Sequence, residues 1–264
     1  MKILTNQPGS AILPAVTQLL VQTLAVDDAF VCLISPWLKD VRLPLGDVGH
    51  YASLLGGRRE EIGLCELLAL IARKHTLHVV TKPPSELVDV RLLKRLAEKV
   101  QARVNVLGAE DLRGYTIVEE LATEFRRDID DLSAAATTHA ETVHLGLLLR
   151  DRGARLSYLD RLHAKLLWTP IGALVGSANF TYGGLISNEE LMLEATDPGV
   201  QPALGEAARQ FLARCRSSEA YSLSRELLRL DVPGGMLAEL AGNPALGAYP
   251  ALVQLLTNLA QFVR

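Results

Sequence analysis

The sequence predicts an α/β protein, an α-β-α sandwich in which helices cover both faces of a mixed β-sheet. Short apolar runs rich in β-forming residues, such as Phe30–Ser35 and Leu77–Thr81, alternate with longer segments of helical periodicity. Two further apolar runs, Leu162–Trp168 and Ala173–Val175, are separated by a tight turn and predict an antiparallel hairpin. Strands that alternate with helices favour parallel pairing, whereas a hairpin is antiparallel, so the expected sheet is mixed.

The elements before residue 110 follow each other in regular alternation. Ser10 is a suitable N-cap for the first helix, and a long loop, Leu38–Gly57, separates the first strand from the second helix. The expected order is helix Ala11–Ala25, strand Phe30–Ser35, helix Gly63–Lys74, strand Leu77–Thr81, helix Val88–Gln101 and strand Arg103–Leu107.

The remaining elements lead into the hairpin, and after it the pattern changes from strands to helices. An acidic segment, Val118–Leu132, is expected to be a solvated helix. Around the hairpin we expect helix Thr142–Arg150, strand Arg155–Tyr158 and strand Leu191–Thr196, followed by helices Ala203–Ser217, Tyr221–Leu230 and Ala248–Val263. The expected organisation is therefore one α/β domain over residues 1–197 and a C-terminal helical extension, residues 198–264, packed on it.

The bulk composition is that of a globular protein in a reducing compartment. Of 264 residues, 49% are hydrophobic and 22% charged, and the net charge of −3 disfavours binding of nucleic acid through the overall field. The three cysteines are widely spaced, which favours reduced thiols. The N-terminus lacks the pattern of a signal peptide, and no apolar run approaches the ~20 residues of a membrane span. We expect a cytoplasmic protein with no membrane partner.

Four polar side chains are expected to converge at the hairpin. His163 and Lys165 are two apart on its first strand, and Ser177 and Asn179 follow its second strand; residues two apart share one face. Lysine offers a compact positive charge for phosphate oxygens, serine and asparagine offer neutral donors, and histidine serves as nucleophile or proton carrier near neutral pH. The cluster therefore suits a phosphodiester, whereas the simpler alternative is a half-buried hairpin with ordinary surface residues.

The residues downstream of the hairpin favour the functional interpretation. The set His163, Lys165, Gly176, Ser177, Asn179, Gly184, Leu185, Asn188 and Glu190 resembles the H-x-K-x4-D-x6-G-S-x-N signature of the phospholipase D superfamily and its following N-x-E. The chain departs from that signature in two ways: Pro170 stands at the aspartate position, and the hairpin is one residue shorter. Since that aspartate is mainly structural in the family, the departure concerns hairpin stability more than chemistry.

The resemblance implies a catalytic mechanism that needs two copies of the motif. In the family, one histidine attacks phosphorus and forms a phosphohistidine, and a second protonates the leaving oxygen. This chain holds one H-x-K and no internal repeat, so we expect a homodimer that pairs two His163 side chains across a twofold axis. By matching positions, Lys165 and Asn179 would hold phosphate oxygens, Ser177 would donate a supporting hydrogen bond and Glu190 would orient the imidazole.

No cofactor or metal is expected, because lysine and histidine supply the positive charge. A zinc site at His139 and His144 is rejected, since residues five apart lie about 140° round a helix. Arg58 and Arg59, near the end of the long loop, are expected to be a solvated pair.

The resemblance favours a metal-independent nuclease, because short single-motif members of the superfamily are commonly nucleases. DNA is favoured over RNA as substrate, with a place in a phage-defence or DNA-modification system and with partner proteins of such a system. The alternatives are a catalytically weak or inactive DNA-binding subunit of a larger complex, and a lipid or small-phosphodiester hydrolase. The acidic surface and Pro170 motivate the first alternative, and Trp37, Trp168 and Tyr182 give slender support to the second.

Overall fold

The computed structural model describes residues 1–7, 12–46, 51–57, 59–87 and 140–221, together with the isolated positions 126, 127, 130, 238, 241, 242, 253 and 257. The chain divides into two compact units, one of Met1–Lys82 with Glu141–Tyr221 and the other of Pro83–Ala140 with Ser222–Arg264. The first unit contains all the strands that are described.

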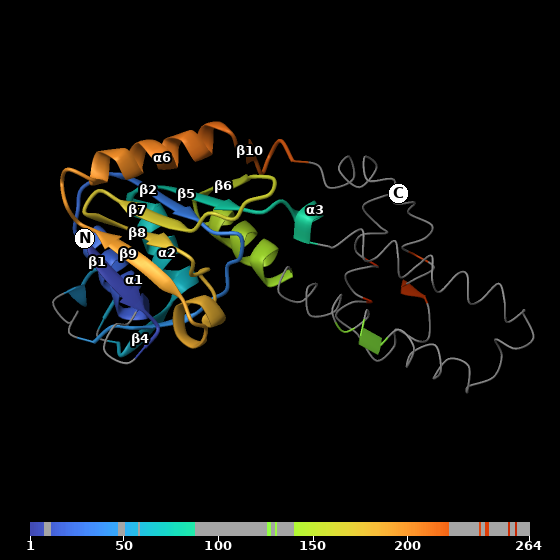
Figure 1. Cartoon of the computed structure of the whole chain (residues 1–264), viewed down its shortest axis with the longest axis horizontal. Helices are drawn as coiled ribbons and strands as arrows, with labels where there is room; N and C mark the ends of the chain where they lie inside the picture. Colours follow the sequence, from blue (N-terminus) through green and yellow to red (C-terminus); the bar gives the residue numbers. More distant parts are fainter. Residues whose placement is uncertain are drawn as a thin grey trace, which may run out of the picture. The chain divides into compact units, whose positions relative to one another are not determined.

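A mixed sheet of eight strands forms the centre of the first unit, in the order β1-β9-β8-β7-β2-β5-β6-β10 (Figure 1). The strands are β1 (Lys2–Thr5), β2 (Phe30–Ile34), β5 (Thr76–Thr81), β6 (Arg155–Tyr158), β7 (Leu166–Thr169), β8 (Gly172–Gly176), β9 (Leu191–Ala195) and β10 (Arg216–Ser217). β5 pairs in parallel with both β2 and β6, and the other pairs are antiparallel. The expected mixed sheet is confirmed.

Helices cover both faces of this sheet, as the sequence predicted. On one face, α1 (Ile12–Thr23), α2 (Leu64–Lys74) and the helical residues 140–151 bury leucines against Leu33 and its neighbours. On the other face, α6 (Gln201–Ala213) packs on Ile34 and Leu166 (Figure 1). Because successive residues of a strand point to opposite faces, β2 supplies both cores and is buried throughout except at Phe30.

The strand register brings many strand ends to one edge of the sheet. Ile34 at the end of β2 pairs with Val80 of β5 and with Leu166, the first residue of β7. Leu166 pairs in turn with Val175, near the end of β8. The carboxyl ends of β1, β2, β5, β6 and β8 and the starts of β7 and β9 therefore share one edge. We call it the catalytic edge, because the residues that the sequence predicts to be catalytic lie there.

Several local features differ from the predictions. β1 was not predicted, and the stretch Leu38–Gly57 was expected to be a loop although it contains β3 (Arg42–Pro44), which pairs with β4 (Glu61–Gly63). Residues 41–46 alternate between buried and exposed, the pattern of a half-buried strand, but Pro44 argued against that assignment. β7 begins at Leu166 rather than Leu162, and α6 ends at Ala213 rather than Ser217 because the chain turns there into β10.

Several predicted elements lie outside the described residues. They are helix Val88–Gln101, strand Arg103–Leu107, most of the acidic helix Val118–Leu132, and the helices Tyr221–Leu230 and Ala248–Val263. The predicted boundary between residues 197 and 198 stays a prediction, although α6, beyond it, packs on the sheet of the first unit. Within the described ranges, every helix is too short or too polar to cross a bilayer.

Candidate active site

The candidate catalytic residues lie at the catalytic edge, where the hairpin of β7 and β8 meets β2 and β9. His163 and Lys165 precede β7 in an irregular segment, rather than lying on the strand as expected. The backbone nevertheless stays in line with the sheet, because the Gly176 N–H donates to the Lys165 carbonyl at 3.3 Å. Ser177 follows β8 directly, and Glu190 directly precedes β9.

The imidazole of His163 and the ammonium of Lys165 lie side by side, but only the imidazole is exposed to solvent. Lys165 Nζ lies 3.5 Å from each ring nitrogen of His163 and donates a hydrogen bond of 2.8 Å to the His163 carbonyl. Lys165 is 6% exposed, whereas His163 is exposed. The ammonium is therefore held in a fixed place, while the imidazole remains accessible to a ligand.

Ser177 and Glu190 are joined across the gap between β8 and β9. The Ser177 hydroxyl donates to Glu190 Oε2, and the Leu191 N–H donates to Ser177 Oγ at 3.0 Å. Glu190 was expected to orient the imidazole, but the hydrogen bond that its carboxylate accepts in this structure comes from Ser177. Orientation of His163 by Glu190 stays a prediction.

Asn179 lies half-buried just beyond Ser177, with its side-chain oxygen fully enclosed. Asn179 Oδ1 accepts no hydrogen bond from any described residue.

The charge of Lys165 is tuned by burial and by two neighbours. Burial lowers the pKa of the Lys165 ammonium below its ordinary value, the Glu190 carboxylate raises it, and the charge of Lys82 lowers it. Lys82 follows β5 at the catalytic edge, and its Nζ lies 5.3 Å from the centre of the Trp37 ring. Two ammonium groups thus act on each other at this edge, an arrangement that an anion between them would stabilise.

One residue that positions the site was not found from the sequence. Asn6, directly after β1, donates from Nδ2 to the carbonyls of Gly184 and Asn188, each at 2.9 Å. It thereby holds the π-helix Gly183–Ser187 and the segment that leads to Glu190. The only sequence signal is an asparagine that ends an apolar run, which is too common to single it out.

The proline at the aspartate position is accommodated by the turn of the hairpin. Pro170 and Ile171 form a two-residue connection between Thr169 and Gly172, which pair with each other. The Thr169 hydroxyl donates to the Gly172 carbonyl at 2.9 Å. The hairpin therefore closes with a hydrogen bond of its own, without the aspartate of the signature that the sequence resembles.

Among the described residues, no three histidine, cysteine, aspartate or glutamate side chains converge as a metal site would require. His144 is exposed on the helical residues 140–151, and His139 is outside the described ranges. Metal independence stays a prediction that chelation can test.

Two glycines of the motif allow the backbone to approach closely at this edge. A Cβ on Gly176 would lie 2.2 Å from the Leu191 carbonyl oxygen, and a Cβ on Gly184 would lie 2.2 Å from the Asn179 carbonyl oxygen. These distances are far below van der Waals contact, and the atoms concerned belong to the backbone, which cannot move aside locally. The glycines thus fix Ser177 beside Glu190 and Asn179 beside the π-helix.

The adjacent glycines Gly183 and Gly184 provide a matched test of this packing. Gly184→Ala should lower the free energy of unfolding by about 1–3 kcal/mol, because the methyl group would overlap the Asn179 backbone. Gly183→Ala should cost less, because its Cβ would meet only the Asn188 side chain at 3.2 Å. Urea unfolding followed by circular dichroism measures both; equal losses would contradict the assigned role of Gly184.

Comparison with known proteins finds similar solved structures at low sequence identity. No family model and no curated protein matches the sequence. The structure is similar to that of Nuc, a phospholipase D family member from Salmonella typhimurium, with 11% sequence identity, a TM-score of 0.42, and coverage of 82% of this chain and 95% of that one. It is also similar to NucT from Helicobacter pylori, with 10% identity, a TM-score of 0.39 and coverage of 82% and 97%.

A third similar structure is that of TrmBL2, an archaeal chromatin protein that binds DNA, with 10% identity, a TM-score of 0.34 and coverage of 82% of this chain and 54% of that one. With identities of 10–11%, it is the arrangement of the site residues, rather than these likenesses, that bears on function.

Proposed function

We propose that this protein is a phosphodiesterase that cleaves nucleic acid, with DNA favoured over RNA, through a phosphohistidine at His163. The observation that carries the proposal is the exposed imidazole 3.5 Å from a buried ammonium at the catalytic edge. Ser177, Asn179 and Glu190 complete the set, as they do in the motif that the sequence resembles.

The proposed reaction consists of two displacements at phosphorus. A ring nitrogen of His163 attacks phosphorus, the bond to the leaving oxygen breaks, and that oxygen takes a proton from a second imidazolium. Water, deprotonated by the second imidazole, then attacks the phosphohistidine and releases the product phosphate monoester and free His163. The ammonium of Lys165 and the amide of Asn179 stabilise the negative charge on the nonbridging oxygens as it develops.

Ser177 and Glu190 act through the groups beside them in this scheme. The hydrogen bond from Ser177 fixes the Glu190 carboxylate, whose charge raises the pKa of Lys165 and so favours its ammonium form.

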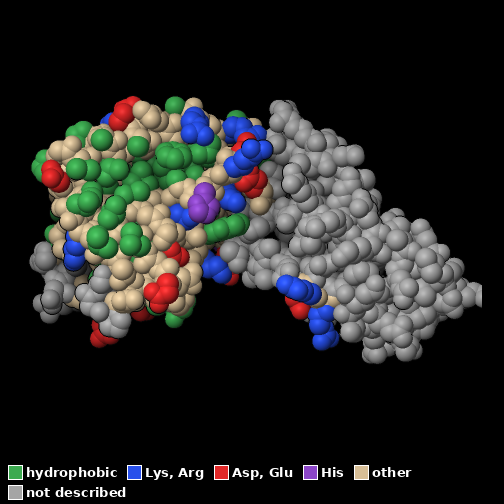
Figure 2. All heavy atoms as spheres, viewed as in Figure 1, with side chains coloured by type: hydrophobic (Ala, Val, Ile, Leu, Met, Phe, Trp, Pro, Cys, Tyr) green, Lys and Arg blue, Asp and Glu red, His purple; other side chains and the backbone are tan. Residues whose placement is uncertain are grey.

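The second imidazole is proposed to come from a second copy of the chain, since each chain holds one motif. An exposed apolar face beside the catalytic edge supports this. Ile3 of β1 is 61% exposed and pairs with Leu193, and Leu191 of the same strand β9 is 50% exposed. These side chains share one face of the sheet, beyond the strands on which α6 packs, and Figure 2 shows apolar side chains gathered over the strands beside α6.

A cytoplasmic location completes the proposal and is supported by three free thiols, two of them buried. A role in phage defence or DNA modification, with partner proteins of such a system, stays a prediction from the resemblance.

Catalysis is tested with a panel of phosphodiesters in the presence and absence of EDTA. The wild type should cleave bis-p-nitrophenyl phosphate and DNA equally well with and without EDTA, and His163→Ala should lose at least about 10³-fold in kcat/KM because the nucleophile is gone. His78→Ala, a change at a half-buried histidine within β5 that takes no part in the proposed reaction, is the control. Retained DNA binding with equal background hydrolysis in wild type and His163→Ala would show an inactive binding subunit instead.

The dimer is tested at its proposed face. Ile3→Lys should shift the protein from dimer to monomer in sedimentation velocity and lower cleavage with it, because a charge would be buried at the contact. Val200→Lys, at an exposed apolar residue directly before α6, is the control and should leave the dimer intact. A wild type that is monomeric and fully active at all concentrations would contradict the two-copy site.

A further inference from the structure

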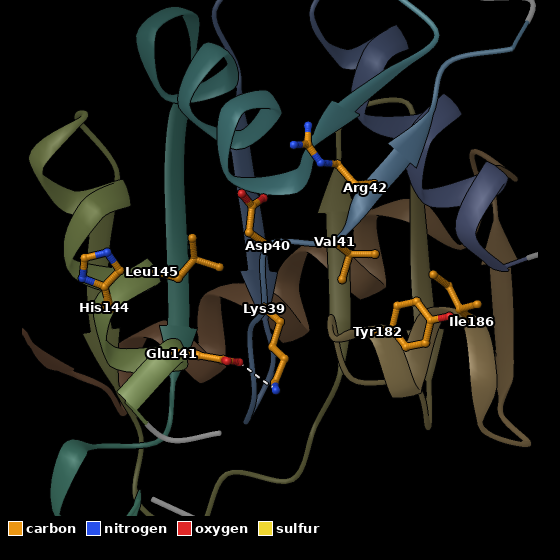
Figure 3. A pocket seen from close by; sticks show the side chains of 9 residues that line it. All are labelled: Lys39, Asp40, Val41, Arg42, Glu141, His144, Leu145, Tyr182 and Ile186. Carbon is orange, nitrogen blue, oxygen red and sulfur yellow. Dashed lines mark ion pairs between the residues drawn. The ribbon is translucent and has the colours of Figure 1, made fainter. Parts of the chain in front are cut away.

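A second concave surface lies on the sheet face covered by α2 and the helical residues 140–151. One hollow, of about 510 Å³, is lined in part by Lys39, Arg42, Glu141, His144 and Tyr182 (Figure 3). Another, of about 550 Å³, is lined in part by Glu66, Arg73 and Arg152. Asp40 and Arg42 line both hollows, so the two are adjacent, and we call them together the basic groove.

The basic groove begins at the catalytic edge and leads away from it. α2 precedes β5 and the helical residues 140–151 precede β6, and both strands run toward the catalytic edge, so both helices run away from it. At the edge, the Thr142 hydroxyl exchanges hydrogen bonds of 3.1 Å with the backbone of Leu38, which bridges to Phe180 of the motif loop. Arg73 and Arg152 lie near the far ends of the two helices.

The carboxylates of the basic groove are already engaged with other groups. Glu141 forms an ion pair of 2.7 Å with Lys39, and Glu66 forms one with Arg59. Asp40 accepts a hydrogen bond of 2.8 Å from the Cys65 N–H at the start of α2. Each of these carboxylates therefore already neutralises a cation or caps a helix.

The charges of the guanidinium groups in the groove are less fully neutralised by carboxylates. Arg42 lies 3.6 Å from Glu61 in a contact where both side chains are more than half exposed. Neither Arg73 nor Arg152 forms an ion pair with a described residue, and both are exposed. The groove thus offers three arginines to an anionic ligand along its length.

The chemistry of the lining favours single-stranded nucleic acid over a protein ligand. Guanidinium forks match phosphate oxygens, and successive phosphates would meet arginines at successive points of the groove. Tyr182 is 59% exposed at the end nearest the catalytic edge, and Figure 3 shows it across Lys39 and Val41 from His144. An exposed aromatic ring stacks on an unpaired base, which a duplex does not offer.

We propose that the basic groove binds a single strand of nucleic acid that extends from the catalytic edge, with its phosphates on Arg42, Arg73 and Arg152 and a base on Tyr182. This inference rests on the proposed nucleic-acid substrate, but it does not depend on which residues perform the chemistry.

Binding is measured by fluorescence anisotropy with a labelled oligothymidylate and a labelled duplex, in the full-length protein carrying His163→Ala so that no cleavage occurs. Arg73→Glu with Arg152→Glu should weaken binding of the single strand at least about tenfold and reduce the slope of log affinity against log salt by about 1 or more. We call this double variant the groove pair. The control pair, Arg155→Glu with Arg214→Glu, alters the net charge by the same amount at two exposed arginines outside the groove, and it should bind the single strand nearly as tightly as the parent does. Tyr182→Ala should weaken the single strand more than the duplex.

Hydrolysis of bis-p-nitrophenyl phosphate separates this inference from the proposed catalysis. With His163 intact, the groove pair should keep the rate on this small ester while losing it on single-stranded DNA, because the ester does not reach the groove. Should the wild type fail to cleave the ester while the groove pair still loses strand binding, the catalytic proposal fails and the groove proposal stands.

The groove proposal would be overturned if the groove pair and the control pair bound the single strand with equal affinity. It would also be overturned if the parent preferred the duplex and Tyr182→Ala left that preference unchanged. Because a charge reversal near the end of α2 also acts on the helix dipole, the milder pair Arg73→Gln with Arg152→Gln is measured alongside. It should show the same direction of change with an unaltered thermal midpoint.

Discussion

The site depends on an ammonium group that is almost entirely withdrawn from water. Lys165 is 6% exposed, and removal of its charge from solvent is costly unless it is paired and hydrogen-bonded. The His163 carbonyl, at 2.8 Å, and the nearby charge of Glu190 provide part of that compensation, while Lys82 opposes it. A bound phosphate group would complete this compensation, because its negative charge would neutralise the buried ammonium.

The surrounding fold is arranged to hold this ammonium in place. Because β2, β5 and β6 are parallel and the hairpin is antiparallel to β2, strand ends from both parts of the chain meet at one edge. Gly176 and Gly184 allow the backbone of β9 and of the π-helix to approach closely, and Asn6 fixes the π-helix from the neighbouring strand. The geometry of the site is thus set by backbone contacts that tolerate no added side chain.

The sequence predicted the features that depend on local patterns and missed those that depend on long-range pairing. β6 was predicted to the residue, and β2, α2 and β8 were close, because apolar runs bounded by turns report burial directly. β3 and β4 were missed because each is three residues long and finds its partner across a long connection. β7 was predicted to begin at Leu162, since an apolar residue at each end of a segment suggests a strand even where the backbone leaves the sheet.

For the site, the spacing of the motif identified which side chains to examine but not how they interact. Ser177 with Glu190, Trp37 with Lys82, and Asn6 with the π-helix are contacts between segments distant in the chain, so no local pattern could reveal them. The basic groove has the same origin: its arginines come from β3, from α2 and from the turn that follows the helical residues 140–151.

The most direct test of the buried ammonium is the alkaline limb of kcat/KM against pH for bis-p-nitrophenyl phosphate, since this parameter reports the ionisation of the free enzyme. Activity should fall as the pH rises through the pKa of Lys165, which burial lowers. Glu190→Gln removes a charge that raises this pKa and should move the limb to lower pH, whereas Lys82→Gln removes one that lowers it and should move the limb to higher pH. Opposite displacements in the two variants are the result predicted here, and a limb that moves in neither variant, or in the same direction in both, would contradict a catalytic role for the Lys165 ammonium.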